Sequence, residues 1–185
     1  MERRVARTGR HHGWYFALLV GAVLMHAALL AQAPSTARQL APTWAPVIGA
    51  PAEFNELMAL SGRQREDRVN ADAGHWEPIL REGIARARQS GQLDVVAEAL
   101  IAQGRALWRL KDAAGAEQAL RESIALNRQL GQREQIFDPM LALGVLLFAQ
   151  YRLDEVLLLN REMLTLAQGN PRREANALTN IGIVE

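Results

Sequence analysis

Side chains that commonly carry out chemistry are sparse in this sequence. The histidines His11, His12, His26 and His75 have no metal-ligand spacing, and the chain has no cysteine. Disulfides, thiolate metal sites and a cysteine nucleophile are therefore excluded. The motifs HExxH and GxSxG, a phosphate-binding glycine-rich loop with lysine and an EF-hand loop are all missing from the sequence. We therefore expect no catalytic, cofactor or metal site, and no enzyme, within these 185 residues.

One short cluster, His75-Trp76-Glu77-Pro78, stands out because it combines an imidazole, an indole and a carboxylate. A functional role would require partner residues that complete a known constellation, and none is present. The simpler interpretation is a helix start, with Trp76 packed on the next element and Pro78 in the first turn.

Composition and charge favour a helical protein without a nucleic-acid partner. The 21 basic and 20 acidic residues give a net charge of +1, but residues 34–185 carry 17 basic and 19 acidic groups. That part of the chain lacks the basic excess typical of nucleic-acid binding. Ala, Leu, Arg, Gln and Glu, which form helices well, dominate the sequence.

Residues 1–33 have the order of an export signal, with a basic head, an apolar run and small residues. The run from Trp14 to Leu30 has no charge and, as a helix, would span roughly 26 Å, close to a hydrocarbon core. We expect either a cleaved signal peptide or an uncleaved transmembrane anchor; a buried soluble helix is the third interpretation. The protein would then be exported across the cytoplasmic membrane, as a periplasmic or inner-membrane-anchored protein. The Pro-rich residues 34–51 are expected to form a linker.

The remainder of the chain contains an internal repeat. When the chain is aligned with itself so that Leu80 lies on Leu120, segment 80–92 matches segment 120–132 at nine of 13 positions. The same offset places Gly144 on Gly104, and Gly182 follows Gly144 at nearly the same spacing. A period of about 40 residues that contains two helical patterns and a short turn is typical of an all-α helical solenoid.

The repeat resembles the tetratricopeptide family in its longer variant. The resemblance rests on Leu143-Gly144 between Met140 and Leu147, on Ile181-Gly182, and on the turn 151–155. It implies helical-hairpin repeats stacked as a right-handed superhelix over 94–185, with a half repeat and N-terminal helices over 52–93. The last repeat is incomplete, so we expect the chain to be a fragment of a longer protein. The pattern predicts helices near 52–66, 76–89, 94–110, 114–130, 135–150, 154–167 and 172–185, with the polar stretch 63–74 as a possible loop.

In tetratricopeptide proteins the first helices line a groove that holds an extended peptide or a helix. Carried onto this sequence, the resemblance implies groove positions at Glu98, Ile101, Arg105, Trp108, Arg109, Asp138, Leu141, Val145, Phe148, Ala149, Asn176, Thr179 and Ile183. An aromatic side chain between two arginines is a mixture enriched in binding hot spots. The alternative is that Trp108 and Phe148 pack between repeats and the arginines are solvated.

Two functions are consistent with these features. The first is an exported or membrane-anchored scaffold that binds a protein or peptide partner in the groove, with a further membrane contact through residues 14–30 if they are not cleaved. The second is the extracytoplasmic sensor region of a larger signalling protein, with an output domain beyond residue 185. An apolar run of about 20 residues downstream would favour the sensor.

Overall fold

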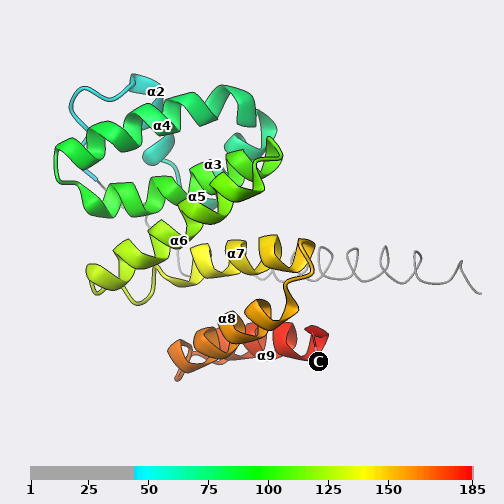
Figure 1. Cartoon of the computed structure of the whole chain (residues 1–185). Helices are drawn as coiled ribbons and strands as arrows, with labels where there is room; N and C mark the ends of the chain where they lie inside the picture. The colour runs from blue at the N-terminus through cyan, green and yellow to red at the C-terminus, as the bar shows by residue number, and fades with distance from the viewer. Residues whose placement is uncertain (1–43, 185) are drawn as a thin grey trace, which may run out of the picture. The chain divides into compact units, whose positions relative to one another are not determined.

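The computed structural model describes residues 44–184, and this part of the chain contains helices and no strand (Figure 1). In chain order the helices are α2 (Ala52–Met58), α3 (Gly62–Ala71), α4 (Ala73–Gln89), α5 (Leu93–Arg109), α6 (Ala113–Gln129), α7 (Phe137–Ala149), α8 (Leu153–Leu166) and α9 (Pro171–Val184). The all-α class predicted from the sequence is thus confirmed for the described residues.

None of the helices within residues 44–184 combines the length and apolarity needed to cross a membrane. The segment 14–30, which the sequence suggests as a signal or anchor, lies outside the described residues.

Alternate helices begin at a constant spacing. The helices α4, α6 and α8 start at Ala73, Ala113 and Leu153, each one sequence period after the last. The turns before α6 and α8 place Lys111 and Tyr151, which are separated by the same period, in the left-handed region at φ values of 68° and 58°. The sequence period therefore corresponds to a recurring helix start and a recurring turn geometry.

Helix caps explain why two of these starts are well defined. The carboxylate of Asp72 accepts the N–H of His75 at 3.1 Å, and that of Asp112 accepts the N–H of Gly115 at 2.9 Å. Each satisfies a backbone donor that the first turn leaves unpaired. The cap at Asp72 also starts α4 earlier than the sequence pattern predicts, at Ala73 instead of Trp76.

The predicted single helix over 52–66 and the possible loop over 63–74 are both wrong. The chain leaves α2 after Met58 and begins α3 at Gly62, where Ser61 and Gln64 form a reciprocal capping box. The helix α3 buries little beyond Arg65 and Val69, so its apolar pattern is too weak to detect. The capping box supplies the helix start that hydrophobic periodicity does not.

The last residues of the segment expected to be a linker are packed against the helices. Val47 is 2 % exposed, and its N–H donates to Asn55 Oδ1 at 2.8 Å. The ring of Trp44 lies under the guanidinium of Arg65, 5.5 Å from its Cζ. Residues 44–51 therefore form part of the folded body.

Two apolar clusters hold the helices together. The first gathers buried side chains of α2 to α5, including Phe54 and Trp76, together with Val47 and Ala119, and the second gathers those of α6 to α9 together with Ile101. Leu107 of α5 packs against both, so the clusters adjoin. Consecutive helices from α3 onward pack on one another, and α3 also packs on α5 and α5 on α7 (Figure 1). The helices α3, α5 and α7 are thereby brought together.

Candidate cleft between α3, α5 and α7

A cleft of about 380 Å³ lies where α3, α5 and α7 meet. Its volume falls in the range of about 300–1,000 Å³ typical of ligand pockets. The residues that line it come mainly from these three helices and partly from α6, and they are Glu66, Asn70, Gly104, Arg105, Trp108, Arg109, Leu120, Leu141, Ala142, Val145 and Leu146.

Five of the residues implied by the sequence resemblance line this cleft together. Arg105, Trp108 and Arg109 come from the last turns of α5, and Leu141 and Val145 come from α7. Trp108 is half-buried, whereas Val145 is 57 % exposed. The structure therefore brings the aromatic and basic residues of one helix next to an apolar face of another.

Other implied residues lie elsewhere. Ile101 is 3 % exposed and belongs to the second apolar cluster, so its side chain serves packing rather than the cleft. Phe148 is half-buried against the same cluster. Asp138 is exposed in the first turn of α7, and Asn176 and Thr179 lie on α9, outside the cleft.

The polar groups of the cleft are partly paired. Arg105 Nη2 lies 3.4 Å from Glu66 Oε2, and this ion pair joins α5 to α3. Arg109 is exposed in the last turn of α5 and makes no ion pair with any residue of the described part. A cation near a helix C-terminus is favoured by the helix dipole. Among the described residues, Arg109 has no ion-pair partner, so it can bind an anionic group in the cleft.

Glu98 does not contribute to the cleft, because it binds Arg65. The guanidinium of Arg65 forms an ion pair with Glu98 and donates to the carbonyl oxygens of Leu57, Met58 and Leu60 at 3.3, 3.2 and 2.9 Å. These carbonyls lie at or just after the C-terminal end of α2, where the helix supplies few donors, and that of Leu57 also accepts the N–H of Leu60 at 3.2 Å. Arg65 is 3 % exposed, so it acts as a buried cap that fixes α2 and α3 to α5.

Gly104 shapes the floor of the cleft. A Cβ atom at this position would lie 2.8 Å from Leu120 Cγ, closer than ordinary contact allows. The absence of a side chain therefore lets α6 approach α5 closely beneath Arg105 and Trp108. Glu66 and Asn70 belong to α3, whose weak apolar pattern gives the sequence no signal that places them in the cleft.

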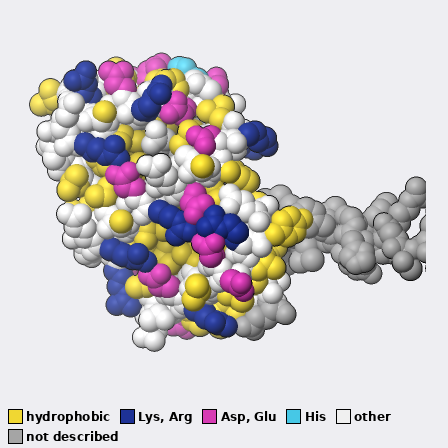
Figure 2. Space-filling view, in the orientation of Figure 1, with side chains coloured by type: hydrophobic (Ala, Val, Ile, Leu, Met, Phe, Trp, Pro, Cys, Tyr) yellow, Lys and Arg dark blue, Asp and Glu magenta, His cyan; other side chains and the backbone are white. Residues whose placement is uncertain are grey.

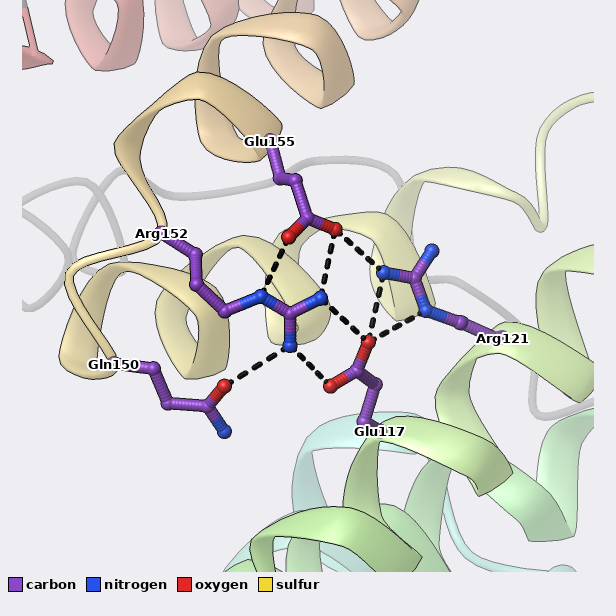
Figure 3. A network of polar contacts seen from close by, with 5 residues as sticks. All are labelled: Glu117, Arg121, Gln150, Arg152 and Glu155. Carbon is purple, nitrogen blue, oxygen red and sulfur yellow. Dashed lines mark hydrogen bonds and ion pairs between the residues drawn. The ribbon is translucent and has the colours of Figure 1, made fainter.

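A second group of polar side chains connects α6 to α8 (Figure 3). Arg152, just before α8, binds Glu117 at 2.5 Å and Glu155 at 2.5 Å, and its Nη1 donates to Gln150 Oε1 at 3.0 Å. Arg121 binds the same two carboxylates at 2.8 and 3.1 Å. Every carboxylate in the network faces two guanidinium groups, so the network fixes the junction between the helices and offers no free base.

The charges of this network shift one another's pKa. Hydrogen bonding to Arg152 is the main reason why the pKa values of Glu117 and Glu155 are lowered, and partial burial opposes it. The same two carboxylates raise the pKa of Arg152. All three groups therefore remain charged throughout the physiological pH range.

Similar ion pairs link α4 to α6 and α6 to α8. Arg88 of α4 binds Glu122 of α6 at 2.6 Å, and Arg128 of α6 pairs with Glu162 of α8. Both residues of the second pair follow the corresponding residues of the first by the sequence period. On the face drawn in Figure 2, basic and acidic side chains lie beside one another with apolar side chains between them. These pairs thus join helices that start one sequence period apart.

No group of three His, Asp or Glu side chains in residues 44–184 is arranged to hold a metal ion. No protein-family model matches the chain, and no curated protein matches it.

Proposed function

We propose that this protein is a scaffold that binds a segment of a partner protein in the cleft between α3, α5 and α7. The observation that carries the proposal is the convergence of Arg105, Trp108, Arg109, Leu141 and Val145 on one cleft. Concave sites with an apolar lining and a few polar groups are the usual places where ligands and peptide side chains bind. The half-buried indole would act as a rigid anchor within it.

The chemistry of the cleft favours a segment with an apolar side chain next to a carboxylate. The apolar side chain would cover Trp108, Leu141 and the exposed Val145. The carboxylate would bind Arg109, because guanidinium groups form paired hydrogen bonds with carboxylates. Arg105 already faces Glu66, so it contributes shape more than free charge.

We further propose that the helical pairs are repeats of the tetratricopeptide type, and that the protein acts outside the cytoplasm. The constant spacing of the starts of α4, α6 and α8 supports the first proposal. The basic head and the uncharged run over residues 14–30 support the second. Fractionation of cells that express the full chain would test the location, since a cytoplasmic product would contradict it.

Peptide selection tests the proposed binding. A displayed library of random peptides is selected on the full chain, and the affinity of a recovered peptide is measured by fluorescence anisotropy. We expect recovered peptides to combine an apolar residue with Asp or Glu. Trp108→Ala and Val145→Glu should each weaken binding at least tenfold. Because Val145 is 57 % exposed, its substitution should leave the fold intact.

Leu158→Ala is the matched control, because Leu158 is 66 % exposed on α8, outside the cleft. This variant should bind like the wild type. If both cleft variants bind like Leu158→Ala, the cleft is not the binding site.

A further inference from the structure

Three charged side chains of the described part line the cleft between α3, α5 and α7, namely Glu66, Arg105 and Arg109. Two of them are guanidinium groups and one is a carboxylate, so together they carry a net charge of +1. The other lining residues are apolar or uncharged. A cleft with this charge is complementary to a ligand that brings a single negative charge.

The two arginines of the cleft have different surroundings. They stand four residues apart in α5 and therefore share one face of the helix. Arg105 Nη2 lies 3.4 Å from Glu66 Oε2, and the Arg105 side chain is 25 % exposed. Arg109 is exposed and has no ion-pair partner among residues 44–184. Glu66 therefore neutralises the less exposed arginine and leaves the more exposed one charged.

Glu66 stays opposite Arg105 because its helix is fixed to the rest of the fold. Its neighbour Arg65 is 3 % exposed, forms an ion pair with Glu98 of α5 and donates to the carbonyl oxygen of Leu60 at 2.9 Å. A carboxylate that is tethered near a guanidinium competes with a free carboxylate at a high effective concentration. A ligand carboxylate that approaches Arg105 must therefore displace Glu66.

We propose that Glu66 determines the charge selectivity of the cleft: the cleft favours a partner segment with one acidic group beside its apolar residue and gains no affinity from a second acidic group. This inference rests on the proposed function of the cleft. The first carboxylate of the segment binds Arg109 and neutralises the charge of the lining. A second carboxylate finds Arg105 already paired and faces Glu66, a group of like charge.

Three versions of one peptide test this selectivity. A peptide selected on the full chain is synthesised with no acidic residue, with one acidic residue next to its apolar residue, and with a second acidic residue beside the first. Isothermal titration calorimetry measures the affinity of each version. The wild type should bind the one-acid version about fivefold more tightly than the version without acid, as expected for a partly exposed ion pair. The second acid should add less than about twofold.

Glu66→Gln keeps the size of the side chain and removes its charge. The lost ion pair is partly exposed, so the variant should remain folded. It should bind the two-acid version about fivefold more tightly than the one-acid version, because Arg105 becomes available. Glu122→Gln is the matched control, since it changes the net charge equally and breaks an ion pair with Arg88 at 2.6 Å, outside the cleft. This control should keep the wild-type preference.

The outcomes distinguish this inference from the proposed function. If the one-acid version binds the wild type more tightly than it binds Trp108→Ala, but Glu66→Gln gains nothing from the second acid, Glu66 does not set the selectivity. The same conclusion holds if the wild type or Glu122→Gln already gains about fivefold from the second acid. If Trp108→Ala binds all versions as tightly as the wild type, the peptide does not occupy the cleft and both proposals fail.

Discussion

Gly83 of α4 is a position at which one added methyl group should destabilise the protein. A Cβ atom there would lie 2.0 Å from Cδ2, 2.2 Å from Cγ and 2.4 Å from Cε2 of Phe54. Phe54 is completely buried, and its ring lies against the helix backbone. Since carbon atoms pack at about 3.5–4.0 Å, the ring would have to move by about 1.5 Å.

The magnitude follows from two opposing effects. Overpacking of a filled core costs about 1–3 kcal/mol, and a displacement of this size belongs at the upper end of that range. Replacement of glycine by alanine inside a helix contributes about 1 kcal/mol in the opposite direction. We therefore expect Gly83→Ala to lower the free energy of unfolding by about 2 kcal/mol.

Urea unfolding of the full chain, followed by circular dichroism in the far ultraviolet, measures the change. With a denaturant slope of about 2 kcal/mol/M, the unfolding midpoint should fall by about 1 M at an unchanged slope. Gly182→Ala is the control, because its Cβ would meet no atom within 4 Å. It should raise the free energy of unfolding by about 0.5–1 kcal/mol. If Gly83→Ala is as stable as the wild type, the packing of Phe54 on α4 has been misassigned.

Three further substitutions test the packing and the charge network. Arg65→Ala should lower the free energy of unfolding by about 3 kcal/mol, since it leaves Glu98 and the carbonyl oxygens of Met58 and Leu60 without the guanidinium donor. Thermal unfolding measures the loss, and an effect below about 1 kcal/mol would contradict the role of Arg65 as a cap. Asp112→Ala should lower the free energy of unfolding, measured in urea, by about 1 kcal/mol because it removes the N-cap of α6. Asp112→Asn should be nearly neutral, and equal losses in the two variants would contradict the cap. The lowered pKa of Glu117 means that its contribution to stability is present above the ordinary glutamate pKa of 4.5 and is lost as the pH falls through the lower, folded-state value. The stability difference between wild type and Glu117→Gln should therefore shrink as the pH falls below 4.5. A difference that does not change with pH over this range would contradict the network.

The sequence predicts those elements whose signals are local and repeated. The repeat offset is visible in the residues themselves, and helices α4 to α9 lie close to their predicted ranges. The helix α3 was missed because its interior side is formed largely by Arg65, whose burial depends on carbonyls and a carboxylate from other helices. Its capping box was the local signal that could have revealed it.

The candidate cleft is predictable only in the part that local, repeated signals determine. Repeat positions bring Arg105 and Trp108 to one surface, but the sequence does not show that Ile101 turns into the core. Nor does it reveal that α3 supplies Glu66, since that contact joins residues far apart in the chain. The close approach of Phe54 to Gly83 is likewise a tertiary contact that no local pattern encodes.

The resonance of the Trp108 indole N–H offers the most direct test of the proposed binding cleft. The chain has four tryptophans, and the Trp108 signal is identified by its loss in Trp108→Phe. A selected peptide is titrated into the full chain, with the Trp76 signal as the internal control because Trp76 is 7 % exposed. The Trp108 signal should shift in proportion to the bound fraction, and the Trp76 signal should remain in place. A peptide that binds without moving the Trp108 signal would contradict the proposal that this cleft holds the partner.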